Sequence, residues 1–189
     1  PEEILSRTFF DRRPEEFYRF YRDKMLCLTA RPNAAHRKLA QLEAAGRLRS
    51  IVTQNIDGLH QLAGSKRVWE LHGSVHRCYC ARCRKPYPES AVNDSVGIPR
   101  CSCGGIIRPD VVLYEEGLDD RILSESLHLI RNAEILIIGG TSLNVYPAAG
   151  LIDYYRGSKL VLINLSETPA DHRANLVIHG KIGEVFSQL

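Results

Sequence analysis

The stretch Ile51-Val-Thr-Gln-Asn-Ile-Asp-Gly-Leu-His60 is followed shortly by Val68-Trp-Glu-Leu-His-Gly-Ser74. The first three residues of the first run are β-branched or strand-favouring and predict a short buried strand, and residues 68–71 predict a second one. Polar residues begin where each strand ends. Since ligands bind at the carboxyl ends of strands in open α/β sheets, the sequence predicts a ligand site there, with an amide pair, a carboxylate and a glycine.

His72 directly follows the second predicted strand and precedes Gly73, so its ring can reach a ligand if the two strands are neighbours. Residues 54–58 are also good turn formers, and a single histidine is often structural. From the residues alone, a catalytic and a structural His72 both stay open.

Composition excludes several classes of protein. The chain has 189 residues, 44% hydrophobic and 25% charged, as expected of a globular protein that forms one domain or a large domain carrying a small insert. No apolar run approaches the roughly 18–20 residues of a membrane span, and no signal-peptide pattern is visible. The net charge is only +3, without a dense basic tract that carries interleaved aromatics. We therefore expect neither a membrane nor a nucleic acid as partner.

Cysteine spacing predicts a metal site. Cys80-x-x-Cys83 and Cys101-x-Cys103 are separated by 17 residues, which suits two knuckles that present four thiolates to one Zn²⁺. Four sulfur ligands leave no open position, so this zinc would be structural. Clustered cysteines also indicate a reducing compartment, and we expect a cytoplasmic protein.

Two further cysteines lie outside this set of four. Cys78 forms its own Cys-x-Cys with Cys80, so spacing alone does not choose between them. Cys27 stands between two leucines and is expected to be a small core residue.

The first part of the chain is predicted to be helical. Helix starts are expected at Pro1 and Pro14, because carboxylates follow each proline, and the helical segment extends to Cys27. An aromatic stripe at residues 17, 18, 20 and 21 is interpreted as the buried face of an amphipathic helix. A further helix is predicted over 34–45, with Asn33 as its cap and Gly46 at its end.

The second half alternates strands and helices. A turn is expected at 108–110, followed by a β-type run over 111–114 and a helix over 119–132. Three further strands are predicted, at residues 134–138, 160–164 and 176–179. The first is expected to be buried on both faces. A turn is expected after the last strand, at residues 180–183. This order predicts an α/β fold with a Rossmann-like parallel sheet and a small helical plus zinc-ribbon lobe.

Several motifs together resemble one family. They are Thr53-Gln-Asn-Ile-Asp-Gly-Leu-His60, Glu70-Leu-His-Gly-Ser74, the cysteine-rich insert, Gly139-Gly-Thr-Ser-Leu143 and Pro147-Ala-Ala149. In this order they resemble the sirtuins, the NAD-dependent protein deacylases, with the bacterial branch most similar. The resemblance implies removal of acyl groups from lysines of a protein or peptide, with NAD as cosubstrate.

The resemblance also implies site residues. His72 would be the general base, with Gln54 on the ribose and Asn55 and Asp57 at the nicotinamide side. The remaining cofactor residues would be Gly140, Thr141 and Ser142, with Asn164 and Ile182 at the adenosine end. Val112 and Tyr114 would flank the acyl-lysine. The zinc ligands would be Cys80, Cys83, Cys101 and Cys103, which leaves Cys78 as a spare thiol without an assigned role.

The sequence departs from the family pattern in the acyl-binding region. Sirtuins that prefer acidic acyl groups have Tyr-x-x-Arg where this chain has Tyr18-Arg-Phe-Tyr21, which favours an uncharged acyl group, although Arg22 keeps the question open. The family's Phe-Gly-Glu, whose backbone pairs with the substrate peptide, is Tyr114-Glu-Glu116 here. The glutamate changes the rim of the expected acyl-lysine tunnel.

The resemblance divides the chain into alternating parts of two domains. Residues 1–31 and 76–106 would form the helical and zinc-binding parts of the small lobe, and 32–75 and 107–189 the Rossmann-like domain. The chain starts at Pro1 and its single methionine is Met25, so we expect its true beginning to lie upstream. Sirtuins carry there a Gly-Ala-Gly-x-Ser loop near the dinucleotide phosphates and a Gly-Ile-Pro-Asp-Phe-Arg segment.

Three other functions stay open at this point. A mono-ADP-ribosyltransferase would use the same fold and cofactor. A non-catalytic nucleotide sensor would explain a sequence without the glycine-rich loop, although His72 argues against it. A zinc-ribbon binding module is the third, and the weak charge counts against nucleic acid as its ligand. The sequence does not indicate an oligomeric state.

Overall fold

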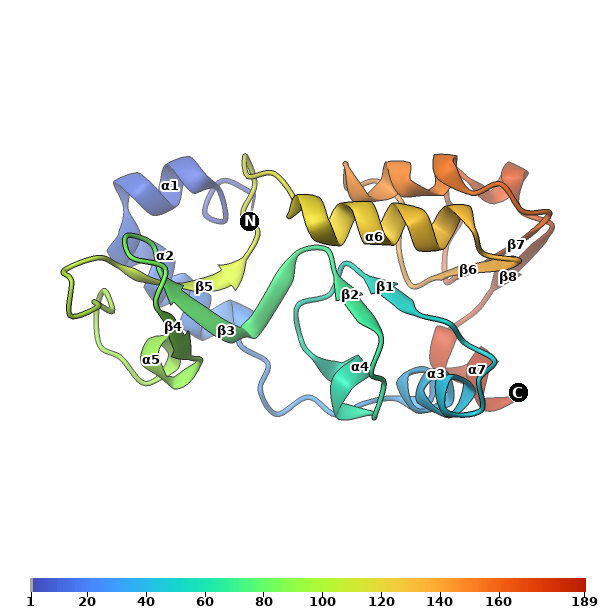
Figure 1. Cartoon of the computed structure of the whole chain (residues 1–189), viewed down its shortest axis with the longest axis horizontal. Coiled ribbons are helices and arrows are strands. Elements are labelled where there is room, and N and C mark those ends of the chain that lie inside the picture. The colour runs from blue at the N-terminus through green and yellow to red at the C-terminus, as the bar shows by residue number, and fades with distance from the viewer. Residues whose placement is uncertain (1) are drawn as a thin grey trace. The chain divides into compact units, whose positions relative to one another are not determined.

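The computed structural model describes residues 2–189, and the chain forms two compact units (Figure 1). Unit 1 contains the residues up to Ala30 together with Thr53–Gly58 and His72–Leu118. Unit 2 contains Arg31–Val52, Leu59–Leu71 and Asp119–Leu189. The chain therefore passes between the units several times, and the loop 53–58 and His72 both belong to unit 1. The domain boundaries expected from the sequence remain a proposal.

Unit 1 begins with helices α1 (Arg7–Arg12) and α2 (Pro14–Phe20) and the π-helix η1 (Tyr21–Met25). The start of α2 at Pro14 confirms the prediction. The predicted start at Pro1 lies outside the described residues, and residues 2–5 form turns rather than helix. The first helix begins only at Arg7 because the hydroxyl of Ser6 accepts a hydrogen bond from the backbone N–H of Phe9 and caps it.

A three-stranded antiparallel sheet of order β4-β3-β5 completes unit 1. Its strands are β3 (Gly73–Cys80), β4 (Pro86–Pro88) and β5 (Ile107–Val111), and the short helix α5 (Ser90–Asn93) follows β4. The turn predicted at 108–110 was wrong, because these residues lie within β5. An edge strand tolerates Pro109, which has no N–H to donate, and Arg108 is held in the strand by a partly buried ion pair with Glu116.

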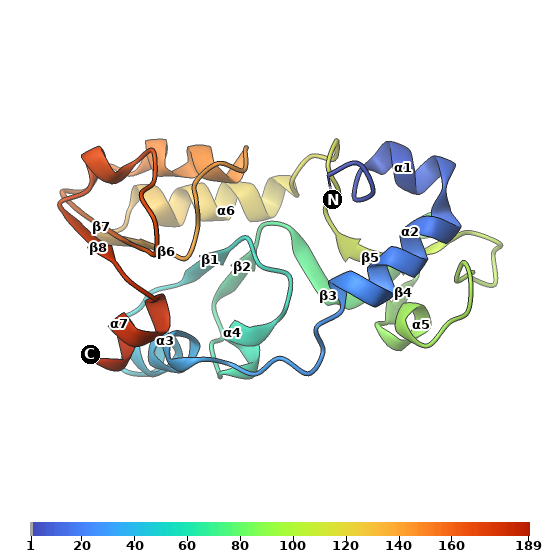
Figure 2. The ribbon, with the colours of Figure 1, turned by 180° about the vertical axis from the view of Figure 1, so that it is seen from behind.

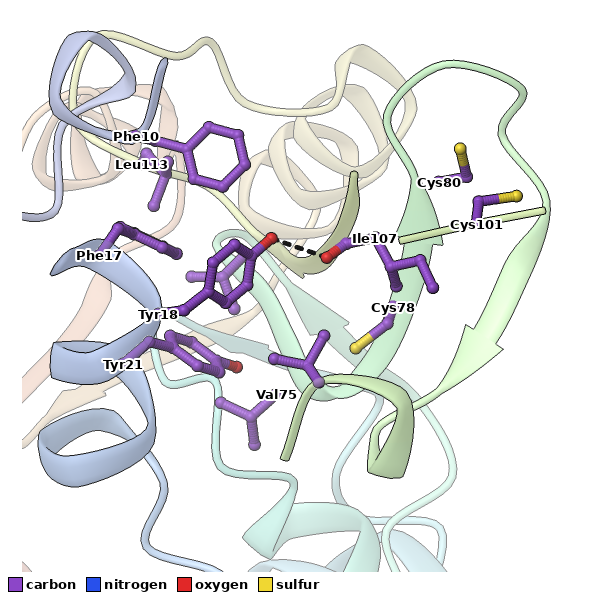
Figure 3. Close-up of a cluster of buried hydrophobic side chains, with 12 residues drawn as sticks. Phe10, Phe17, Tyr18, Tyr21, Val75, Cys78, Cys80, Cys101, Ile107 and Leu113 are labelled. Carbon is purple, nitrogen blue, oxygen red and sulfur yellow. Dashed lines mark hydrogen bonds between the residues drawn. The ribbon is translucent and has the colours of Figure 1, made fainter. Parts of the chain in front are cut away.

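The core of unit 1 is an aromatic cluster at the centre of Figure 3. Phe10, Phe17 and Tyr18 meet edge to face, and Tyr21 stacks on Phe17. The hydroxyl of Tyr18 donates to the backbone oxygen of Ile107 at 2.7 Å, so its polar end is satisfied although the residue is fully buried. The stripe predicted from the sequence is thus a core face.

Unit 2 is built on a parallel sheet of order β6-β7-β8, with strands β6 (Ile135–Gly139), β7 (Lys159–Asn164) and β8 (Leu176–His179). The strands β1 (Ile51–Thr53) and β2 (Val68–Glu70) pair with each other in a two-stranded sheet. The predicted α/β fold with a Rossmann-like parallel sheet is confirmed, as is the pairing of the two strands around the central loop. No helix in the described part of the chain is long and apolar enough to cross a membrane.

Helices and 3-10 turns surround these strands in unit 2 (Figure 2). They are α3 (Ala34–Ala44), α4 (Leu59–Leu62), α6 (Asp120–Arg131), α7 (Ile182–Ser187), η2 (Ala148–Tyr154) and η3 (Asp171–Arg173). Asn33 caps α3 through the backbone N–H of His36, as predicted. The helices α3 and α7 lie side by side in both views.

Strand β7 is buried on both faces, because its side chains point alternately to the two faces of the sheet and each face is covered by an apolar cluster. Leu160 and Leu162 pack into a cluster with η2, whereas Ile163 packs with Phe186 of α7 and Ala35 of α3. A strand enclosed in this way requires a continuous apolar run, and residues 160–163 supply it.

Two predictions for unit 2 were wrong. Strand β6 was expected to be buried on both faces, but Ile135 and Ile137 are 52% and 46% exposed. Its side chains alternate between the two faces of the sheet, and only the face with Leu136 and Ile138 packs against the apolar cluster beside η2. The turn predicted at 180–183 is in fact the start of α7, which begins at Ile182.

Candidate active site and metal centre

The loop after β1 is fastened to the segment 72–76 by three hydrogen bonds within unit 1. The backbone oxygen of Gln54 accepts from Nδ1 of His72 at 2.9 Å, and that of Ile56 accepts from the backbone N–H of Val75 at 3.0 Å. The backbone oxygen of Asp57 lies 3.0 Å from Nε2 of His76. The loop that carries the predicted nicotinamide-side residues is therefore held in register with the predicted base.

The contact with Gln54 decides the tautomer of His72. A backbone carbonyl can only accept, so Nδ1 of His72 carries the hydrogen. In the neutral imidazole the other nitrogen, Nε2, then has the lone pair. The half-buried ring is fixed in the form in which Nε2 is the basic atom.

The loop itself is shaped by local polar contacts. The backbone N–H of Asn55 donates to the hydroxyl of Thr53 at 3.1 Å, and its side-chain amide lies 3.5 Å from a carboxylate oxygen of Asp57. Gly58 has a φ of +68°, a left-handed conformation that favours glycine and turns the chain out of the loop. Of the predicted residues, the structure joins Gln54 to His72 through its backbone oxygen and joins Asn55 to Asp57 within the same loop.

A cavity of about 600 Å³ lies in unit 2 at the carboxyl ends of β6 and β7. Three of the predicted cofactor residues, Gly140, Asn164 and Ile182, line it, whereas Thr141 and Ser142 do not. Gly140 has a φ of +65° and donates its N–H to the backbone oxygen of Ile163, which turns the chain at the end of the strand. The cavity is large enough for a nucleotide-sized ligand.

Sequence reasoning missed several lining residues of this cavity. Asn33 was interpreted only as a helix cap, and Lys181 and Glu184, which form an ion pair of 3.2 Å, were placed in or beside a turn. Their position in the chain could have indicated the cavity, because Lys181 is the N-cap residue of a helix that directly follows a parallel strand.

Four cysteines gather in unit 1 at the ends of two turns. The sulfur atoms of Cys80, Cys83, Cys101 and Cys103 all lie within 4.8 Å of one another, with 3.5 Å between the first and last and 3.7 Å between the middle two. Tetrahedral coordination with Zn–S bonds near 2.3 Å places sulfurs about 3.8 Å apart. The set fits a zinc ion, and it is the set that the sequence predicts.

Hydrogen bonds favour the thiolate at two of these sulfurs, Cys80 and Cys101. The backbone N–H groups of Cys83 and Arg82 lie 3.4 Å from the sulfur of Cys80 and lower its pKa. The backbone of Cys103 and the hydroxyl of Tyr87, 3.0 Å away, lower the pKa of Cys101 to about 6. Thiolates are the form that binds zinc.

The two remaining cysteines differ from each other. Cys78 is buried in the aromatic core and does not belong to the set of four, and burial raises its pKa to about 11, so it is an unreactive thiol. Cys27 was predicted to be a core residue, which was wrong, because it is exposed. It follows the end of η1 in irregular chain, and its neighbour Leu28 is 44% exposed.

The run after β5 carries the predicted substrate residues. Val112 donates its backbone N–H to the backbone oxygen of His72 at 3.0 Å. The backbone of Tyr114 is paired at both groups, since its N–H donates to Leu5 and its oxygen accepts from Arg7. The expected pairing with a peptide would therefore use other residues of the run, while the side chain of Tyr114 is 45% exposed.

Glu115 occupies the position where the family has glycine, and it adopts a backbone conformation that is typical of glycine. Its φ is +74°, in the left-handed region that a non-glycine residue rarely occupies. Its carboxylate accepts a hydrogen bond of 2.8 Å from the backbone N–H of Thr8 in the first turn of α1. This bond lowers the pKa of Glu115 and compensates the strained backbone.

Comparisons with known proteins agree with these features. The model of the Sir2 family matches residues 1–147. The NAD-dependent protein deacetylase of Clostridium acetobutylicum is 58% identical over 188 residues, which cover 98% of this chain and 77% of that protein. The corresponding protein of Clostridium perfringens is 56% identical over 191 residues and matched over 78% of its length. A structure of Sir2 bound to acetylated peptide superposes with a TM-score of 0.94 at 42% identity, over 98% of this chain and 81% of that one. The chain belongs to the Sir2 family.

Proposed function

We propose that this protein removes acetyl or related uncharged acyl groups from protein lysines in an NAD-dependent reaction that yields nicotinamide and O-acyl-ADP-ribose. Curated relatives are NAD-dependent protein deacetylases, and a related Sir2 structure holds a p53 peptide and NAD⁺. The observation that carries the proposal for this chain is the bond from His72 Nδ1 to Gln54, which leaves Nε2 basic beside the loop with Asn55 and Asp57.

His72 acts in this proposal as the general base. NAD supplies the ribose that accepts the acyl group and the nicotinamide that leaves. Nε2 of His72 takes the proton of a ribose hydroxyl, and Nδ1 keeps its bond to the loop throughout, so that the ring does not rotate. Gln54 holds the ribose, and Asn55 and Asp57 hold the nicotinamide side.

The cavity in unit 2 is the proposed site for the adenosine end of NAD. Asn164 and Ile182 line the adenosine end, and Gly140 allows the backbone to approach the ligand closely. Thr141 and Ser142 follow Gly140 in the same loop and are the remaining residues that we propose as contacts of the cofactor.

The zinc ion has a structural role. Four thiolates complete its coordination and leave no position for water or substrate. It joins the turns after β3 and before β5, and thereby stabilises the sheet that carries His72 at one end.

The contacts of Arg22 support an uncharged acyl group. Its guanidinium donates to the backbone oxygens of Val92 and Gly97 and to the hydroxyl of Ser95, at 2.9, 2.6 and 2.7 Å. Nε and Nη2 are committed to these acceptors, so only Nη1 is left for an acyl carboxylate and a two-pronged contact through Nε and Nη2 is not available. Tyr21, at the place of the family's arginine, is buried in the core. Val112 and Tyr114 would then flank a neutral acyl chain.

Incubation of the protein, expressed from its complete reading frame, with NAD and acetylated or succinylated peptide tests the proposal. We expect nicotinamide and O-acetyl-ADP-ribose to form with the acetylated peptide only, and mass spectrometry detects both products. ADP-ribose attached to protein would instead indicate a mono-ADP-ribosyltransferase. Binding of NAD without formation of a product would indicate a nucleotide sensor. We also propose a cytoplasmic location, supported by six free cysteines.

A further inference from the structure

His76, on strand β3, lies between two hydrogen-bond acceptors. Its Nδ1 contacts a carboxylate oxygen of Glu89, and its Nε2 lies 3.0 Å from the backbone oxygen of Asp57. The ring is also seated against Gly58, where an added Cβ would lie only 2.7 Å from its Cδ2. The histidine thus contacts the turn at the end of the predicted cofactor loop both through a hydrogen bond and through packing.

The two acceptors determine the protonation of this ring. A neutral imidazole has one N–H and cannot donate at both nitrogens, whereas the imidazolium donates at both. The carboxylate of Glu89 stabilises the additional charge, and the neighbouring Arg77 is engaged with Asp110 at 2.9 Å. The arrangement therefore fits a protonated His76 that donates to Asp57 and to Glu89 at once.

We propose that His76 is a positioning residue for NAD: the N–H at its Nε2 fixes the Asp57–Gly58 turn, and Glu89 holds the ring in place and protonated. This inference rests on the proposed function, in which Asn55 and Asp57 hold the nicotinamide side. Of the three hydrogen bonds that fasten the loop, the bond from His76 reaches the carbonyl of Asp57 itself. A displacement of about 1 Å at such a residue is enough to reduce turnover substantially.

Two substitutions at His76 separate the hydrogen bond from the packing. His76→Leu removes both donors, and we expect the KM for NAD to rise on the order of 10-fold with little change in the KM for acetylated peptide. His76→Gln retains one N–H donor that can reach Asp57, and most of the loss should be recovered. His172→Leu, at an exposed histidine of η3, is the matched control. An unchanged KM for NAD in His76→Leu, or equal damage in His76→Gln, would overturn the proposal.

Glu89→Gln tests the role of the charge. The glutamine amide can donate to Nδ1, which leaves a neutral ring with its hydrogen on Nε2, still able to donate to Asp57. We expect a KM for NAD near that of the parent protein in this variant, whereas Glu89→Ala should raise it.

Nitrogen NMR of ¹⁵N-histidine-labelled protein gives a readout that does not depend on activity. The chain has seven histidines, and the signals of His76 are identified as those that disappear in His76→Gln. We expect two protonated ring nitrogens for His76 in the parent protein and one in Glu89→Gln. A single protonated nitrogen in the parent protein would refute the assignment. If the parent protein had no deacylase activity but showed both protonated nitrogens, the proposed function would fail while the contact itself would stand.

Discussion

Nδ1 of His72 donates to the backbone oxygen of Gln54 at 2.9 Å, so the predicted base is oriented by the same loop that carries the predicted nicotinamide-side residues. Base and loop cannot move independently while this bond is present. Substitutions at His72 therefore have to separate the loss of the base from the loss of the anchor.

His72→Asn makes this separation, because the asparagine amide can still donate to Gln54 but offers no basic nitrogen. We expect His72→Asn and His72→Ala to lose deacylation alike, by roughly 10²–10⁴ in kcat. Both should keep their zinc and their fold. Turnover in His72→Asn close to that of the parent protein would show that Nε2 is not the base.

Cys101→Ser should abolish stoichiometric zinc binding, because one of four thiolates is removed from a closed tetrahedral site. Cys78→Ala is the matched control, since this buried thiol lies two residues from Cys80 on β3 but outside the set. Metal content of the purified variants, measured by mass spectrometry, should be one zinc per chain only in the control. Loss of zinc in Cys78→Ala would instead place that thiol among the ligands.

Arg108→Met should destabilise the protein by about 2 kcal/mol, because the half-buried Glu116 then keeps only Arg7 and the Leu113 backbone N–H as partners. Arg108 is 4% exposed and contacts both carboxylate oxygens of Glu116, at 2.6 and 2.8 Å. The double variant Arg108→Met/Glu116→Leu should recover part of the loss. Chemical denaturation of the set measures these free energies of unfolding, and additive losses would contradict a coupled pair.

The same pair predicts a dependence of stability on pH. Burial opposes ionisation of Glu116, but the bonds from Arg108 and from the Leu113 backbone hold its pKa below the usual value. A lowered folded-state pKa means that the stabilisation is complete above the unfolded-state value of about 4.3 and is lost as the pH falls through the folded-state value. The parent protein should lose more stability than the double variant over this acid range, as urea denaturation at several pH values would reveal.

Glu115→Gly and Glu115→Ala separate backbone strain from the carboxylate contact. Both remove the bond to Thr8, but only alanine keeps a Cβ at a φ of +74°. We expect Glu115→Gly to melt about 2–4 °C above Glu115→Ala. Equal melting temperatures in calorimetry would mean that the left-handed backbone carries no cost.

Gly139→Ala should weaken NAD binding, on the order of 10-fold or about 1.4 kcal/mol, without unfolding the protein. The added Cβ would collide with Cδ1 of Ile182, which is the free end of a side chain and can turn into the cavity. Gly117→Ala, with open space around its Cα, is the matched control. Isothermal titration with NAD compares the two, and equal affinities would remove Ile182 from the adenosine end.

Local patterns predicted most elements of the fold and much of the site. The apolar runs at 160–164 and 176–179 became parallel strands, the cap at Asn33 formed, and the cysteine spacing identified a cluster that fits zinc. These features depend on neighbours in the sequence, since side-chain alternation, capping and knuckle spacing act over a few residues.

What local patterns could not predict depends on partners far along the chain. Residues 108–110 resemble a turn, but Arg108 is drawn into a strand by Glu116, and Ile135 is apolar yet exposed because it lies on the face of β6 opposite the apolar cluster. The cavity residue Lys181 was likewise hidden in an apparent turn.

The sequence by itself determined which residues could do chemistry here: an imidazole after a strand, an amide-carboxylate loop and four thiolates. Only the tertiary structure decided the state in which this imidazole and that of His76 are held. Nδ1 of His72 meets a carbonyl 18 residues away, and His76 meets an acceptor at each nitrogen. Proton positions follow from the partners that folding brings within hydrogen-bond distance, and no local pattern encodes those partners.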